Sequence, residues 1–129
     1  MATTCNNIAL RPLTLEVHNS IFTGSNPNEV IIIDATEGSE PESLNIALNQ
    51  TILKVDESEN DLDFASICDG CIINPEEDLF LDEAQSDFSL DTSSVARNAG
   101  LPLPQLQIDI IGKLRDAMSP DIGCYEFVD

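Results

Sequence analysis

Cysteine and histidine are the residues of this 129-residue chain best suited to bind metals or to carry out redox chemistry. Cys68 and Cys71 form a Cys-x-x-Cys pair, a spacing found in zinc sites and in redox motifs. Zinc needs two further ligands, but Cys5, Cys124 and His18 stand at no motif spacing. A redox motif needs a strand followed by a helix, which this segment does not predict. We therefore expect small buried thiols or disulfides, with three pairings open among the four cysteines.

A run of carboxylates is the second candidate for chemistry, because Ca²⁺ prefers carboxylate oxygens as ligands. The run lacks the glycine and the distal glutamate of an EF-hand loop, so we favour a solvated acidic loop. The calcium candidates are Asp56, Glu57, Glu59, Asp61 and Asp63. We expect no cofactor, and calcium is the one alternative that stays open.

Catalytic side chains are not expected in this sequence. No Gly-x-Ser-x-Gly elbow or other nucleophile signature accompanies the single histidine, His18, which we interpret as a surface residue at a strand end. A polysaccharide lyase would combine calcium-binding acids with a basic residue, and only five basic residues exist. The chain is therefore predicted not to be a complete enzyme.

The charge of the chain excludes several partners. Twenty-four acidic residues against five basic ones give a net charge of −19, which repels nucleic acid and anionic membranes. No apolar run reaches the roughly 18 residues of a membrane span. The charge suits solubility in a salty extracellular medium, or else a cation or a basic partner. No signal peptide is visible, so the chain is either cytosolic or cut from a longer secreted precursor.

Short strand signals separated by turn residues and seven prolines predict an all-β fold. Residues 13–17 alternate strictly between apolar and polar, whereas residues 30–33 are continuously apolar, which predicts burial on both faces. Further strands are expected at residues 64–67, 71–73, 79–81, 88–90, 106–111 and 122–127.

One segment repeats another. Residues 44–53 align without gaps on residues 13–22 at an offset of 31, with apolar, amide and hydroxyl positions matched. If each repeat is one coil, the two segments lie side by side in register, and the chain holds about four coils. The aligned amides of Asn19 and Gln50 would then stack as a ladder.

A series of short motifs follows from Asp78 onward. Residues 94–100 (SVARNAG) and 121–126 (DIGCYE) are similar to S-P-A-I-N-A-G and D-I-G-A-Y-E, and DLFLD and DFSL precede them. Asp109, Gly112 and Arg115 keep the spacing D-x-x-G-x-x-R. In this order, over about 50 residues, the series resembles the end of secreted bacterial parallel β-helix proteins, which are pectate-lyase-like and carry a choice-of-anchor Q domain. Val95, Arg97 and Cys124 depart from the pattern.

The resemblance implies a right-handed parallel β-helix of about four coils. It implies one domain over residues 1–129, in which residues 78–129 form a C-terminal cap. The glycines suit positive φ or close backbone approach, and Arg115 would pair with Asp121 or Glu126 to pin the last loop. The structural motif residues are Ser94, Asn98, Gly100, Asp109, Gly112, Arg115, Asp121, Gly123, Tyr125 and Glu126.

Three functions stay open at this point. The first is a non-catalytic capping module of a secreted or cell-surface protein that contacts carbohydrate or a protein partner. The second is a fragment or subunit of a polysaccharide lyase or glycoside hydrolase, and the third is a subunit that stacks end to end. An uncapped first coil predicts that its edge, near residue 13, pairs with upstream coils or with a neighbouring subunit.

Overall fold

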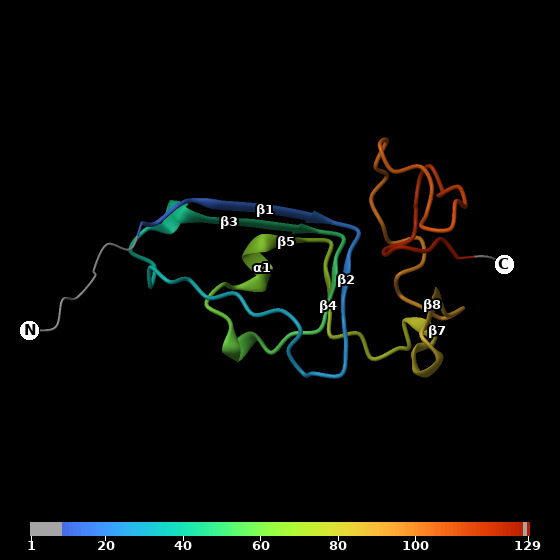
Figure 1. Cartoon of the computed structure of the whole chain (residues 1–129), viewed down its shortest axis with the longest axis horizontal. Helices are drawn as coiled ribbons and strands as arrows, with labels where there is room; N and C mark the ends of the chain where they lie inside the picture. The colour runs from blue at the N-terminus through green and yellow to red at the C-terminus, as the bar shows by residue number, and fades with distance from the viewer. Residues whose placement is uncertain (1–8, 128) are drawn as a thin grey trace, which may run out of the picture.

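The computed structural model describes residues 9–127 and 129, and its parallel strands form an L-shaped stack (Figure 1). Both arms of the L are three-stranded parallel sheets with strands in chain order. The long arm contains β1 (Leu13–His18), β3 (Leu44–Asn49) and β5 (Cys68–Asp69), and the short arm contains β2 (Ile21–Phe22), β4 (Ile52–Leu53) and β6 (Ile72–Ile73). We call each strand–corner–strand unit a rung, so the stack has three rungs.

The expected pairing of residues 13–22 with residues 44–53 is confirmed. Leu13 pairs with Leu44 in the long arm, and Ile21 pairs with Ile52 in the short arm. Because parallel pairing keeps the register constant, side chains of the same type stack in columns across the first two rungs.

The corners explain why amide residues and glycine stand at matched positions. Asn19, Gln50 and Gly70 have φ values of 47°, 42° and 66°, in the left-handed region that glycine and asparagine adopt most easily. In the first two rungs a hydroxyl then bonds back to the strand: Ser20 Oγ donates to the His18 carbonyl, and Thr51 Oγ1 donates to the Asn49 carbonyl. The sharp bend is therefore encoded locally in each rung.

The prediction of a β-helix with about four coils is wrong. The described residues form three small separate sheets and no solenoid or closed sheet. The number of residues between successive rungs is not constant. Ile52 pairs with Ile21 on one side and, on the other side, with Ile72, which is much nearer to it in the sequence. The third sheet is an antiparallel pair, and beyond it the described chain adds only the isolated antiparallel bridge Ile108–Leu114. The third sheet consists of β7 (Phe80–Asp82) and β8 (Asp87–Leu90).

Short polar side chains account for the missing strands, because they take backbone donors that a ladder would use. Asp63 accepts from the Ala65 amide and starts α1 (Phe64–Ile67) where a strand was expected. The Ile32 amide donates to Asn60, so residues 30–33 form no strand, and Ile31 and Ile33 are 57% and 69% exposed instead of buried.

No helix of the described residues is long and apolar enough to cross a membrane. The remaining short turns are the 3-10 segments η1 (Pro41–Ser43), η2 (Glu57–Glu59) and η3 (Glu83–Gln85).

Two apolar clusters lie on opposite sides of the short arm. The first, which includes Leu48, Leu53 and Phe64, fills the inner angle of the L, where Figure 1 shows α1. The second lies between the outer side of the short arm and the C-terminal region, and Ile52 and Ile122 are fully buried in it. The C-terminal region is thus packed against the stack.

A disulfide joins Cys68 to Cys71 across the third corner, which selects among the pairings left open above. Cys5 lies outside the described residues. The bridge closes a loop of four residues, a size for which chain entropy corresponds to a stabilisation of about 2 kcal/mol.

We expect dithiothreitol to lower the free energy of unfolding by about that amount, as measured by urea denaturation. A Cys68→Ser/Cys71→Ser variant should be insensitive to the reductant, whereas a Cys124→Ser control should respond like the unchanged protein. An equal stability of the fully reduced and oxidised protein would contradict this prediction.

Candidate functional site

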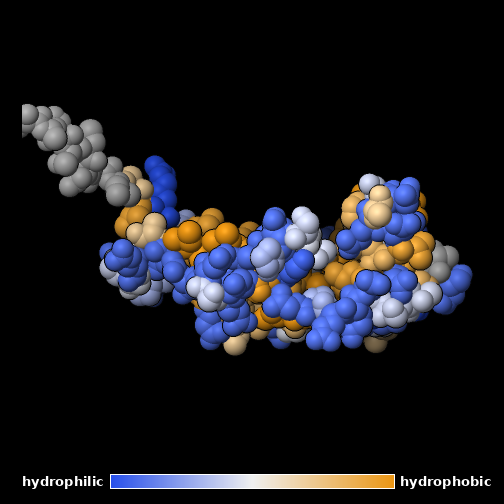
Figure 2. Space-filling view, turned by 90° about the horizontal axis from the view of Figure 1, so that it is seen from below, coloured by the Kyte–Doolittle hydropathy of each residue, from blue (hydrophilic) through white to orange (hydrophobic). Residues whose placement is uncertain are grey.

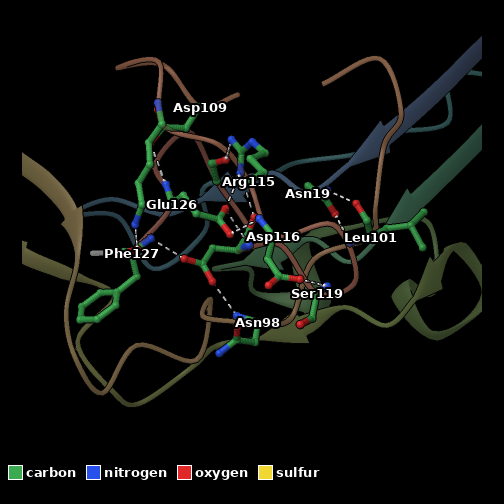
Figure 3. A network of polar contacts seen from close by, with 12 residues as sticks. Asn19, Asn98, Leu101, Asp109, Arg115, Asp116, Ser119, Glu126 and Phe127 are labelled. Atoms are coloured by element: carbon green, nitrogen blue, oxygen red, sulfur yellow. Dashed lines mark hydrogen bonds and ion pairs between the residues drawn. The ribbon is translucent and has the colours of Figure 1, made fainter. Parts of the chain in front are cut away.

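A network of polar contacts centred on Arg115 lies in the C-terminal region (Figure 3). The Arg115 side chain is only 7% exposed, and Nη1 lies 3.3 Å from Oε2 of Glu126, which is 8% exposed. The guanidinium also donates to the carbonyls of Asp121 and Gly123, at 3.2 and 2.8 Å. The sequence left Asp121 and Glu126 as alternative partners, and Glu126 makes the ion pair. We call the cluster formed by Arg115, Asp109, Asp121 and Glu126 the carboxylate lock.

The three buried carboxylates of the lock accept mainly from backbone amides. Asp109 accepts from Ile111, Lys113 and Glu126. Asp121 accepts from Asn98 and Phe127, and Glu126 accepts from Asp116 and Asp121. Seven backbone N–H groups therefore donate to the three carboxylates. These donors are needed because the one guanidinium of Arg115 cannot neutralise three negative charges. The expected strands at residues 106–111 and 122–127 do not form. The amides of Ile111, Glu126 and Phe127 donate to these carboxylates, and other amides of the two segments donate to carbonyls outside any strand ladder.

The electrostatics of Asp109 fit this arrangement. Burial raises its pKa, but the amides of Glu126, Lys113 and Ile111 and the charge of Arg115 outweigh burial, so the pKa lies below the ordinary 3.8. Asp109 is therefore ionised at neutral pH and acts as a hydrogen-bond acceptor for the backbone.

The motif glycines serve the backbone geometry that the sequence predicted. Gly112 and Gly123 have φ values of 85° and 106°, and a Cβ on Gly123 would approach Ile21 to 2.9 Å. Gly100 lies against backbone, because its Cβ would meet the Pro120 carbonyl oxygen at 2.7 Å. The glycines thus allow the C-terminal region to lie close to itself and to the first rung.

The other motif residues have separate places. Ser94 is buried and accepts from the Ala96 amide, and Asn98 takes a φ of 54° beside the lock. Tyr125 lines a groove beside the short arm. Asp116 was not anticipated, although its Asx turn to Met118 and Ser119 is a local signal that sequence inspection could have used.

The expected amide ladder between Asn19 and Gln50 is wrong. Asn19 Nδ2 donates to the carbonyl of Leu101, and the Leu101 amide donates back to Oδ1, each at 2.7 Å. The first corner is therefore tied to a residue 82 positions away, and the Asn19 carbonyl also accepts from Gly123.

The calcium candidates do not converge on one point. Asp56 and Asp63 cap η2 and α1, Glu59 accepts from Asn28, and Asp61 accepts from the Asp34 amide. Within residues 9–127 and 129, no three His, Cys, Asp or Glu side chains are grouped closely enough to hold a metal ion. Asp56 and Asp63 thus organise local turns, Glu57 lies in the first turn of η2, and Glu59 and Asp61 connect the acidic run to the loop that contains Asn28 and Asp34.

His18, Phe80 and Phe88 line the same groove beside the short arm as Tyr125 does. His18 Nε2 lies 2.9 Å from Oε1 of Glu16, its neighbour two residues away. Phe80 and Phe88 pack edge to face, with ring planes 88° apart.

The first rung forms one of the two ends of the stack. Among the described residues, β1 and β2 each have a partner strand on one side only, as do β5 and β6 at the other end of the stack. On the first rung Leu13 and Leu15 are 52% and 44% exposed, whereas their register partners in the second rung, Leu44 and Ile46, are half-buried. Figure 2 shows apolar side chains reaching the surface of both the strand half and the C-terminal half of the molecule.

Comparison with known protein families, curated proteins and solved structures found no match to this chain.

Proposed function

We propose that this protein is a non-catalytic structural module that binds an extended segment of a separate polypeptide along the open edge of β1 and β2. The observation that carries the proposal is the exposure of the apolar column of β1 beside an unpaired strand edge. A strand added there would cover Leu13 and Leu15 and would satisfy the backbone of the first rung.

The hydrogen bonds between the first and second rungs determine which backbone groups of β1 and β2 point away from the stack. The Ser20 and Phe22 carbonyls accept from Ile52 and Lys54, so the backbone of the intervening Ile21 faces the open side. In β1, the Asn19 amide donates to Asn49, so by alternation Val17 and Leu15 also face β3. The amides that face outward are those of Thr14, Glu16, His18 and Ile21.

A strand–corner–strand segment from another polypeptide fits this edge better than a second copy of the chain does. A two-fold axis that pairs β1 with its copy makes the strands antiparallel and sends the two corners to opposite ends, which leaves β2 unpaired. The net charge of −19 also opposes self-association. A partner with Lys or Arg beside Glu16 would gain a favourable cross-strand pair.

The other half of the proposal is a capping role for residues 78–129. It rests on the motif series that resembles the end of secreted parallel β-helix proteins, and on the carboxylate lock, which binds the C-terminal region to itself. Together with a disulfide, which persists in oxidising compartments, the resemblance favours a secreted or cell-surface location.

Amide hydrogen exchange tests the open edge with an internal control. In a monomeric sample we expect the outward amides of Thr14 and Glu16 to exchange fast and those of Leu15 and Val17 to exchange slowly. A peptide of residues 44–53 flanked by lysines should then protect Thr14 and Glu16. Equal protection of all four amides without peptide would contradict the proposal. Protection that appears only as the protein dimerises would assign the edge to a second copy and would also overturn it.

A further inference from the structure

A groove lies beside the open edge of β2, and the proposed strand pairing does not itself involve this groove. Its volume is about 1010 Å³, and β2, the β7–β8 pair and the C-terminal region all contribute to it. Its lining is largely apolar and includes Ile21, Phe80, Phe88, Ile108, Ile110 and Tyr125. The groove therefore adjoins the place where a strand added to β2 would run.

The sequence of the stack indicates which side chain would enter this groove. The second residue after each left-handed corner is isoleucine in all three rungs: Ile21, Ile52 and Ile72. These three residues are paired in one column across the short arm. Ile52 is fully buried there, and Ile21 and Ile72 pack against the same cluster.

The next position of this column lies inside the groove. A fourth strand would be about 4.8 Å from β2, on the side away from Ile52. Ile21 lines the groove, so a side chain continuing the column would lie between Ile21 and the apolar residues of the C-terminal region.

We propose that this groove selects a bulky apolar side chain, two positions after the corner of the incoming segment. The inference rests on the proposed function and adds a rule for the partner: Asn, Gln or Gly at the corner, any small residue next, then isoleucine or a residue of similar size. The corner requirement follows from positive φ, and the apolar requirement follows from the lining of the groove.

Two peptides separate this inference from the proposed function. The first has the sequence of residues 44–53 between lysines, and the second has Asp in place of the isoleucine two positions after the corner. The first should bind about 10- to 100-fold more tightly in titration calorimetry, because burying one such side chain contributes that factor. Equal affinities would overturn the groove's role and leave strand addition standing. Failure of both peptides to bind would overturn the proposed function and, with it, this inference.

A protein variant localises the effect to the groove. Ile110 lines the groove and is 69% exposed, so Ile110→Lys should fold normally and should reduce the difference between the peptides to less than about threefold. Ile33 is equally exposed and does not line the groove, so Ile33→Lys should keep the full difference. A full difference in Ile110→Lys, or the same reduction in both variants, would contradict the inference.

Discussion

Replacing Arg115 with Met is expected to lower the free energy of unfolding by about 3–5 kcal/mol, because it leaves buried carboxylates without their cation. The Arg115 and Glu126 side chains are 7% and 8% exposed, so water cannot compensate for the lost charge. The same substitution also removes donors to the Asp121 and Gly123 carbonyls. Urea denaturation followed by circular dichroism measures the change.

Arg97 provides a matched control for this measurement. It is paired with the fully exposed Asp129 at 3.7 Å and stacks on the ring of Phe127, so Arg97→Met should lower stability by only about 1 kcal/mol. An Arg115→Met/Glu126→Gln variant should recover part of the loss, because it removes the uncompensated carboxylate. If Arg115→Met were no more destabilising than Arg97→Met, the lock would not hold the C-terminal region.

The stack could be predicted where the sequence repeats a local pattern. Strict alternation in residues 13–17, together with its copy in the segment that starts at Leu44, was enough to place β1 beside β3 in the correct register. The match between Asn19 and Gln50 was also predicted, but the left-handed corner that each of them forms was not. The alternation and its repeat depend on neighbouring residues and on side-chain period, both of which can be read from a sequence.

The number of coils could not be predicted, because the repeat changes length. The third rung follows the second after a shorter stretch of chain than the second follows the first, since Asp63 caps a helical turn in place of a strand. The carboxylate lock was predicted only in part. The ion pair of Arg115 is local in sequence, but the bond between Asn19 and Leu101 spans 82 residues and follows no periodic signal. Long-range polar contacts of this kind depend on the finished fold.

The largest single side chain in the inner angle of the stack gives the second strong prediction. Phe64 is 0% exposed, and it packs in one cluster with Leu48, Leu53 and Val55. Truncating it to Ala would remove most of a buried ring and leave a cavity that α1 cannot close, because α1 is four residues long and joined directly to β5. We expect Phe64→Ala to lower the free energy of unfolding by about 3–5 kcal/mol, as measured by urea denaturation.

Phe88 separates this cavity effect from the general loss of an aromatic ring. It is 45% exposed and packs edge to face on Phe80, so Phe88→Ala should lower stability by no more than about 1.5 kcal/mol. Phe64 lies in the inner cluster, whereas the C-terminal region packs against the outer one. Phe64→Ala should therefore also speed exchange of the inward-facing amides of Leu15 and Val17, which depend on the β1–β3 ladder. If Phe64→Ala and Phe88→Ala destabilised the protein equally, or if the Leu15 and Val17 amides kept their protection, α1 would not be what supports the stack from inside.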